Sequence, residues 1–176
     1  MSFSHRLADP SDLEGLSAVM DAAITVLQAP FLTPGQIEAS RVIMGLDTQL
    51  IADRTYFVVE EDDRIAGCGG WSRRATLYGG DHTSEREPRL LVPGREPARV
   101  RAMYTAPGFE RRGVGRLVLS LCENAARTEG FTHVELAGTL SGEPLYRACG
   151  YEVVERFTDS RGGAFVPLAR MRKRLA

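Results

Sequence analysis

The segment of the chain best suited to chemistry is residues 105–116, which read TAPGFERRGVGR. Two glycines, Gly113 and Gly115, and three arginines stand there directly before a stretch whose apolar residues recur at helical spacing. A helix start offers unpaired backbone N–H groups and the positive end of the helix dipole, and glycine lets a phosphate approach that backbone without a Cβ in the way. The segment therefore predicts a diphosphate site. A glycine turn that caps a helix beside solvated arginines would explain the same residues.

Two well-known phosphate loops do not match this segment. A dinucleotide-binding Rossmann loop needs a third glycine at the position that Val118 occupies here. A nucleotide-binding P-loop needs a lysine before a serine or threonine, and the only lysine of the chain is Lys173. The residues of the loop alone therefore leave the kind of diphosphate open.

A second motif follows further along the chain, where residues 145–151 read LYRACGY. Taken in order, the two segments resemble the GNAT superfamily of acetyl-coenzyme A-dependent N-acetyltransferases. Gly113 and Gly115 match its pyrophosphate loop, Q/R-x-x-G-x-G/A, and residues 145–151 match its pattern L/F-Y-x-x-x-G-F/Y. Glu110 departs from the first position of the loop. The resemblance extends over essentially the whole chain and is weakest in the first two helices and in residues 76–97.

The resemblance implies how acetyl-CoA is bound. In the family, the strand before the loop, here residues 98–105, parts from its neighbour and holds the pantetheine arm with its backbone. A backbone N–H of Met103 or Tyr104 then polarises the thioester carbonyl, a kind of contact worth roughly 3–4 kcal/mol in barrier height. Thr139 stands where the family often has an asparagine. The implied cofactor-binding residues are Met103, Tyr104, Thr105, Arg111, Arg112, Gly113, Val114, Gly115, Arg116 and Thr139.

Tyr146 occupies the position of the family's usual general acid, which gives a proton to the leaving thiolate. A phenol with a pKa of about 10 is protonated at neutral pH. A thiol with a pKa of about 8.5, taking cysteine as a guide, makes this acid helpful rather than indispensable. The alternative interpretation of Tyr146 is a half-buried aromatic side chain that braces a short helix.

The base that removes a proton from the amine is not identified by the sequence. A lysine-like amine, with a pKa of about 10.4, arrives protonated and must lose that proton before it attacks. Glu135, His82, Asp81 and Glu85 are candidates by residue type only. A chain of water molecules is an equal alternative.

The activity that the resemblance implies is transfer of an acetyl group from acetyl-CoA to an amine by direct attack in a ternary complex. The acceptor would be a small-molecule or peptide amine, and no feature of the sequence selects between these. Two alternatives stay open: a non-catalytic acyl-CoA-binding or sensing module on the same fold, and a transferase that uses a larger acyl-CoA donor. Family habit favours a homodimer.

Composition and charge predict a soluble globular protein. The chain has 176 residues, of which 43% are hydrophobic and 26% charged, and its formal net charge of −1 gives no bias toward nucleic acid or an anionic membrane. No apolar run approaches the length of a membrane span, and the N-terminus carries no apolar signal region. Cys68, Cys122 and Cys149 lack CxxC spacing, which is typical of reduced thiols in a cytoplasmic protein. The scattered histidines predict no metal site.

The hydrophobic pattern predicts one domain, residues 1–176, of the α/β (α+β) class. The expected order is β-α-α-β-β-β-α-β-α-β-β, a mixed, mostly antiparallel central sheet flanked by helices, which is the GNAT acyl-CoA acyltransferase fold that the resemblance implies. The second helix, opened by a capping box at Thr33 and Gln36, is expected to run to about Leu50. Residues 76–97 are rich in glycine, proline and charge and are expected to form a loop near the substrate site.

Three glycines, Gly67, Gly69 and Gly70, fall within one predicted strand. Glycine inside a strand marks a bulge or a place where another backbone approaches closely. A twisted strand packed tightly under a helix is the plainer explanation.

Overall fold

The fold is built on one seven-stranded sheet. The computed structural model of the protein describes residues 2–176. The strands lie in the order β1-β2-β3-β4-β5-β7-β6, and every neighbouring pair is antiparallel except β4 and β5. Their bounds are β1 Ser4–Leu7, β2 Tyr56–Glu61, β3 Arg64–Ser72, β4 Ala98–Thr105, β5 His133–Gly138, β6 Glu152–Asp159 and β7 Val166–Arg174. The mixed, mostly antiparallel sheet expected from the sequence is confirmed.

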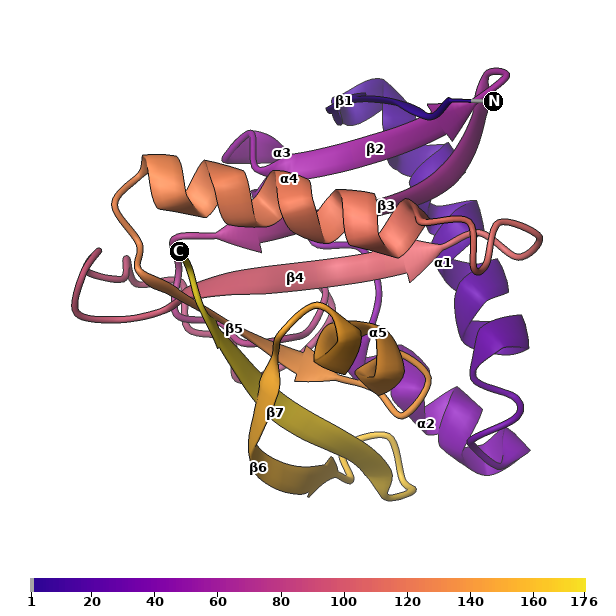
Figure 1. Cartoon of the computed structure of the whole chain (residues 1–176). Helices are drawn as coiled ribbons and strands as arrows, with labels where there is room; N and C mark the ends of the chain where they lie inside the picture. Colours follow the sequence, from indigo (N-terminus) through magenta and orange to yellow (C-terminus); the bar gives the residue numbers. More distant parts are fainter. Residues whose placement is uncertain (1) are drawn as a thin grey trace.

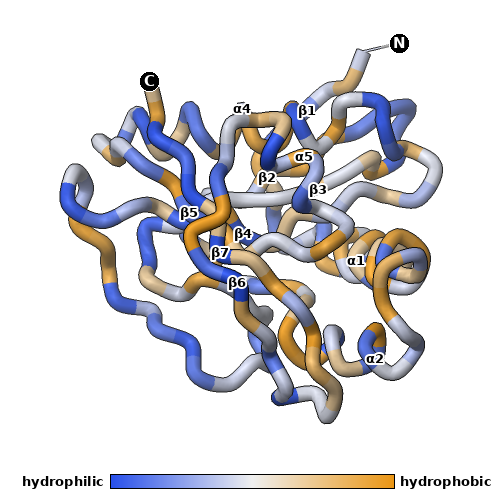
Figure 2. The backbone as a smooth tube through the Cα atoms, turned by 60° about the horizontal axis from the view of Figure 1, so that its bottom comes forward, coloured by the Kyte–Doolittle hydropathy of each residue, from blue (hydrophilic) through white to orange (hydrophobic). Residues whose placement is uncertain are grey.

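Helices cover both faces of this sheet (Figure 1). On one face, Gly67 and Gly69 of β3 lie under α4; on the other, Cys68 packs in a cluster with Leu16 and Met20 of α1. Hydrophobic residues run along much of α1 (Figure 2), as the burial of one side of this helix requires. The helices are the 3₁₀-helix η1 Pro10–Asp12, α1 Leu13–Leu27, α2 Pro34–Ile43, α3 Thr48–Ala52, α4 Val114–Thr128 and α5 Glu143–Ala148.

The second predicted helix is two helices, which corrects one expectation. Its capping box forms as predicted, but α2 ends at Ile43 rather than near Leu50. Gly45 has a φ of 132°, which is not helical, and Asp47 then caps the separate helix α3 with its side chain. The apolar positions of α2 and α3 fall close enough in sequence to imitate one helix, although the chain turns between them.

The glycines of β3 bring α4 unusually close to the sheet. A Cβ on Gly67 would collide with the Val114 side chain, and one on Gly69 would lie 2.6 Å from Cγ1 of Val118. Real Cβ atoms do not come so near a neighbour, so only glycine allows this packing. The plainer explanation of these glycines, a strand packed tightly under a helix, is therefore confirmed. Their absence of side chains fixes the height of α4 above the sheet.

A bulge also occurs, but it lies in the facing strand β4. The pairing of β3 with β4 shifts register between Cys68 and Gly70. Opposite this point Ala102 has a φ of 49°, and its carbonyl accepts a hydrogen bond of 2.6 Å from the Tyr56 hydroxyl. A bulge of this kind bends its strand and redirects the side chains beside it.

The parallel strands β4 and β5 pair only where they begin. Ala98 lies opposite Val134 and Arg99 opposite Glu135, and no further pairs follow. Figure 1 shows the two strands diverging beyond this point. The later part of β4, from Val100 on, consequently has a backbone edge without a neighbouring strand, as the resemblance implied.

Among residues 2–176, no helix combines the length and apolar character needed to cross a bilayer. The same residues include no group of three or more His, Cys, Asp or Glu side chains placed to hold a metal ion. The three cysteines are free thiols; Cys68 and Cys122 are buried, and Cys149 is half-buried.

Candidate active site

A cavity of about 820 Å³ passes through the opening between β4 and β5. Its size falls within the range of small-molecule and cofactor sites. We call the part lined by residues 109–111, 113–116, 139, 141, 142, 144–146 and 148 the α4 end. The part lined from residues 23–31, 43–45 and 77–79 and by Leu168 is the α1 end. Residues 100–105 of β4 line the passage between the two ends.

The start of α4 forms the wall of the α4 end. Gly113 is the N-cap residue, with a φ of 89°, and no side chain caps this helix. A Cβ on Gly113 would meet nothing within 4 Å, so the space beside it is open. Val114 and Gly115 also line the cavity. The first N–H groups of the helix and its positive dipole end are therefore available to an anion.

Gly115, the second glycine of the loop, is packed closely against a neighbouring helix. A Cβ on Gly115 would lie 2.6 Å from Cδ2 of Leu145 in α5. Gly115 thus lets α4 and α5 meet at the edge of the cavity. The sequence motif is one pattern, but Gly113 provides conformation and open space, whereas Gly115 provides helix contact.

The three arginines of the loop are placed differently. Arg111 and Arg116 are exposed and line the α4 end. Arg112, predicted as a cofactor-binding residue, does not line the cavity: its guanidinium forms a 2.7 Å ion pair with Glu61 of β2. The same group lies 5.2 Å from the ring centres of two phenylalanines, Phe3 and Phe109. Pairing to an acid on another strand explains why it is held away, and sequence position alone does not reveal that partner.

Glu110, the departure from the family pattern, stabilises the turn. Its Oε2 accepts a hydrogen bond of 2.5 Å from the N–H of Gly108, whose φ is 93°. The carboxylate is the only acidic group among the described residues that line the cavity. Its negative charge offsets part of the positive charge at this end.

The open edge of β4 runs past the loop. Met103, Tyr104 and Thr105 all line the cavity, as the sequence predicts. The N–H of Ala106 donates to the carbonyl of Ala66 in β3, at 2.9 Å. Backbone groups alternate in direction along the regular part of a strand, so Tyr104 turns its N–H toward β3 and Thr105 turns its N–H toward the opening.

Tyr146 lies in the cavity wall on α5, with 9% of its surface exposed. Its ring packs edge-on to Tyr151, with ring centres 6.0 Å apart. Among the described residues its hydroxyl has no hydrogen-bond partner. Burial raises the pKa of the Tyr146 phenol to about 12, so it keeps its proton at neutral pH.

Thr139 also lines the cavity, but its hydroxyl is already used. It accepts the N–H of Gly142 at 3.2 Å and lies 3.1 Å from the Ser141 hydroxyl. These contacts order the turn that leads into α5. The side chain thus positions the segment that carries Tyr146.

The first of the candidate bases, Glu135, is not placed to act as one. Glu135 is 2% exposed and does not line the cavity. Its carboxylate is held by the guanidinium groups of Arg99, at 3.0 Å, and of Arg172. Its two arginine partners give this residue a structural role in the sheet.

The three other candidate bases belong to the long loop, and none lines the cavity. His82 donates from Nε2 to the carbonyl of Arg41, at 2.7 Å. Asp81 lies 3.5 Å from the Arg86 guanidinium, and Glu85 is exposed. The structure therefore places none of the four candidate bases in the cavity wall.

Sequence reasoning missed the residues of the α1 end. Gln28, the C-cap residue of α1, is 6% exposed, and Tyr78 donates from its hydroxyl to Asp159 at 2.7 Å. Tyr104 was predicted for its backbone, yet its hydroxyl also accepts the N–H of Gly45 at 3.0 Å. A polar glutamine on the apolar stripe of α1 was the one local signal available.

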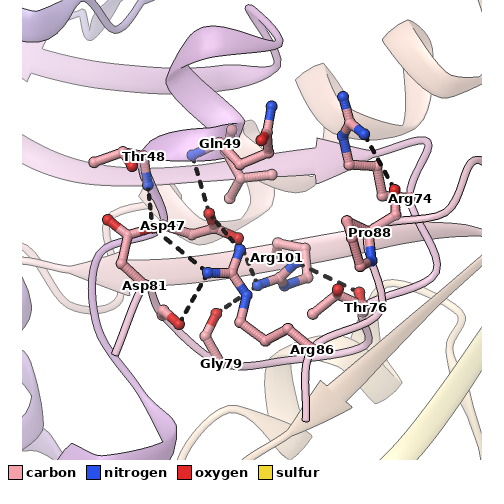
Figure 3. Close-up of polar contacts among 12 residues, drawn as sticks. Asp47, Thr48, Gln49, Arg74, Thr76, Gly79, Asp81, Arg86, Pro88 and Arg101 are labelled. Atoms are coloured by element: carbon pink, nitrogen blue, oxygen red, sulfur yellow. Dashed lines mark hydrogen bonds and ion pairs between the residues drawn. The ribbon is translucent and has the colours of Figure 1, made fainter. Parts of the chain in front are cut away.

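A buried ion-pair group supports this end (Figure 3). Asp47, before α3, lies between two guanidinium groups: that of Arg101 on β4, at 2.9 Å, and that of Arg86 in the long loop, at 2.8 Å. Arg101 also donates to the carbonyl of Gly79, at 2.5 Å. The group ties the loop and α3 to β4 beside its bulge, which holds Tyr78 against the cavity. The loop is thus near the candidate site, as expected.

An open strand edge beside an uncapped helix start is suited to an extended ligand that carries phosphate groups. The chain belongs to the acetyltransferase (GNAT) family, because residues 20–151, well over half of its length, match the model of that family. The two motifs of the loop and of α5 both fall within the matched range or at its border. No curated protein matches the sequence.

Solved structures share the fold over nearly the whole chain. A GCN5-related N-acetyltransferase from Rhodopseudomonas palustris superposes with a TM-score of 0.74, at 17% identity, covering 99% of this chain and 97% of that one. PaiA N-acetyltransferase from Thermoplasma acidophilum, in complex with coenzyme A, gives 0.65 at 14% identity, covering 99% of each chain. YncA from Salmonella typhimurium, with its cofactor acetyl-CoA, gives 0.65 at 17% identity, covering 100% and 95%. The GNAT fold is thereby confirmed.

Proposed function

We propose that the protein is an N-acetyltransferase that binds acetyl-CoA at the α4 end of the cavity and an amine at the α1 end. The observation that carries the proposal is the continuity of the site. The uncapped start of α4, the open edge of β4 and Tyr146 line one passage through the sheet. Family membership and the coenzyme-bound neighbours support the same activity.

The residues of the α4 end fit a carrier with a diphosphate and an extended arm. Gly113 leaves open space beside the free N–H groups of the helix, and Arg111 and Arg116 add positive charge. The unpaired edge of β4 can accept an arm that carries amide groups, in the manner of an added strand. Thr139 and Ser141 would contribute to this wall through the turn that they order.

Bound acetyl-CoA supplies an activated thioester: the C–S bond breaks as the amine nitrogen forms the C–N bond, and a proton lost by the amine balances the one that the thiolate takes up. Met103, which follows the bulge at Ala102, would polarise the thioester carbonyl, because the N–H of Tyr104 turns toward β3. Tyr146 would donate a hydrogen bond to the leaving sulfur. Its pKa of about 12 is higher than the pKa of about 8.5 of a thiol. The phenol therefore keeps its proton and stabilises the thiolate through a hydrogen bond.

The amine proton would leave through water. The described cavity walls contain no carboxylate or imidazole at the α1 end, and the four candidate bases lie outside the cavity. Transfer to solvent needs no residue at a fixed position, and it suits an amine that enters already neutral.

The test measures binding and turnover in Gly113→Val. Coenzyme A affinity, by calorimetry, should fall at least about 100-fold, which corresponds to about 2.7 kcal/mol. The matched control is Gly94→Val: Gly94 has a φ of 78° and open space around it but does not line the cavity, so it suffers the same backbone strain without touching the site. Both variants should remain folded by circular dichroism.

Release of free thiol from acetyl-CoA with a panel of amines completes the test. Wild-type protein should release thiol with at least one amine. Tight coenzyme binding without release on any amine would contradict the transferase and favour an acyl-CoA sensor. Unchanged affinity in Gly113→Val would contradict the placement of the diphosphate. Competition between acetyl-CoA and succinyl-CoA distinguishes the larger-donor alternative.

A further inference from the structure

The α1 end of the cavity is apolar. Its side chains come from three separate helical and loop segments and from β7, and they meet on the α1 face of the sheet. Phe31 is 48% exposed, which is consistent with a place at the mouth, whereas Ile43 is 1% exposed. The apolar lining consists of Ala23, Ile24, Leu27, Phe31, Ile43, Met44, Leu77 and Leu168.

The charged groups near this end are already paired. Among the described residues, Arg101 is the only cation that lines the passage there; its two terminal nitrogens are bound by Asp47 and by the carbonyls of Gly79 and Thr76, and its Nε is buried without a partner. The only carboxylate of the described cavity lining, Glu110, belongs to the α4 end. A second ammonium on the acceptor would therefore be buried without a counter-ion, and a carboxylate would have to compete with Asp47 for Arg101, which is unfavourable in both cases.

One polar side chain at the α1 end is underused. Gln28 is 6% exposed, and its only hydrogen bond is a 3.3 Å contact from Nε2 to the sulfur of Met44. The carboxamide oxygen has no hydrogen-bond partner among the described residues. This oxygen is not among the fully enclosed polar atoms of the described residues, so it is accessible from the cavity that Gln28 lines, and a carboxamide can make several hydrogen bonds. An uncharged polar group of a ligand would satisfy it.

Tyr104 offers a second neutral contact nearby. Because its hydroxyl accepts the N–H of Gly45, its own proton is free to donate into the cavity. Tyr78, in contrast, uses its proton on Asp159. The α1 end thus presents neutral hydrogen-bonding groups on an otherwise apolar wall.

Resting on the proposed transferase function, we infer that the acceptor is a compact primary amine with an apolar body and no second charge, and that Gln28 is its polar contact. Such an amine forms the new C–N bond from its neutral form, with its excess proton released to water. Polyamines, basic side chains and free amino acids do not fit, because each brings a further charge to the apolar wall.

The experiment compares three amines with the same six-carbon chain: n-hexylamine, 1,6-diaminohexane and 6-aminohexanoate. Thiol release is measured at pH 9 and saturating acetyl-CoA. We expect kcat/KM for hexylamine to exceed that of either charged analogue by at least about tenfold. A diamine or an aminohexanoate that reacts as well as hexylamine would overturn the inference. No release with any of the three, in a protein that binds coenzyme A, would instead count against the transferase function on which the inference rests.

A charge placed at the α1 end should reverse the preference. Gln28→Glu keeps the shape of the side chain and adds a carboxylate, so the ratio of diamine to hexylamine kcat/KM should rise at least about tenfold. Gln36→Glu, in the capping box of α2 and outside the cavity, adds the same charge and should leave the ratio unchanged. Should Gln28→Glu fail to fold, Phe31→Glu at the mouth serves instead, with the same expected direction. An unchanged ratio in a folded variant would overturn the role of this end.

Discussion

The two ends of the cavity differ in the groups that form them: one is formed mainly by main chain and the other by side chains. The α4 end depends on main-chain features: an uncapped helix start, a glycine with positive φ and an open strand edge. The α1 end depends on individual side chains, contributed by segments that lie far apart in the chain. A carrier common to many enzymes can be held by backbone, whereas an acceptor peculiar to one enzyme must be recognised by side chains.

The ends also differ in how they manage charge. At the α4 end, Arg111 and Arg116 are exposed and free to meet an anion. At the α1 end, Arg101 is 3% exposed at its side chain, and its charge is neutralised by Asp47, which is 1% exposed. The exposed arginines can attract an anionic ligand. The paired arginine presents little net charge to the α1 end, and its contacts hold the long loop on β4.

Breaking the buried ion pair should have the largest effect on stability. Of the two ends of the cavity, only the α1 end should change its binding. Asp47→Asn leaves Arg101 and Arg86 without their shared carboxylate, so the free energy of unfolding should fall by about 3–5 kcal/mol. Chemical denaturation measures this loss. The control is Asp21→Asn, which removes an exposed partner of Arg41 and should cost no more than about 1 kcal/mol.

In the folded fraction of Asp47→Asn, the KM for the amine should rise while the affinity for coenzyme A stays the same. The reason is that the ion pair holds the long loop, and with it Tyr78, but touches nothing at the α4 end. Equal loss at both ends would contradict the separation drawn between them.

Removing the hydroxyl of Tyr146 should affect turnover without affecting either binding site. Tyr146→Phe should lower kcat by about 100-fold, the lower range for a positioned acid, with unchanged coenzyme affinity. Tyr151→Phe is the matched control, because its hydroxyl donates to Glu123 outside the cavity. Because burial raises the pKa of Tyr146 to about 12, the phenol is still protonated at pH 10. The rate of the wild-type protein should therefore show no decline near pH 10.

The two glycines of the loop should separate binding from stability. Gly115→Val forces a side chain against Leu145, so we expect a loss of about 1–3 kcal/mol in the free energy of unfolding. The double variant with Leu145→Ala should recover part of that loss. Thermal denaturation and calorimetry with coenzyme A measure both quantities. A variant that loses coenzyme affinity but keeps full stability would show that Gly115 acts as Gly113 does.

The smallest effects should come from the surface charges of the α4 end. Arg111→Gln should weaken coenzyme A binding by about fivefold, or about 1 kcal/mol, and the difference should shrink as salt is raised. Arg112→Gln is the internal control: because Glu61 holds this arginine away from the cavity, affinity should not change. A larger effect at Arg112 than at Arg111 would mean that its ion pair opens on binding.

The same contrast explains what the sequence could predict. Backbone sites leave local signatures, because glycine, helix periodicity and strand patterning lie in one short segment. The bounds of β4, the start of α4 and the placement of Gly113 and Tyr146 in one cavity follow from such signals. Their roles in binding and catalysis stay predictions.

The α1 end could not be predicted in this way. Gln28, Met44, Tyr78 and Leu168 meet only after the helices pack on the sheet, and no period of 2 or 3.6 residues connects them. The position of Arg112 outside the cavity was missed for the same reason, since its partner Glu61 lies on another strand. The length of α2 was overestimated because a turn at Gly45 interrupts a pattern that stays apolar on both sides.

The brief pairing of β4 with β5 has a consequence for how the molecule opens. Ala98 with Val134 and Arg99 with Glu135 are the pairs that join strands β1 to β4 to the group formed by β5, β7 and β6. Such a seam divides a sheet into two cooperative units that can exchange their amide hydrogens at different rates. A ligand that contacts both units across the seam would link them. Its binding should therefore slow amide hydrogen exchange even in strands that it does not contact.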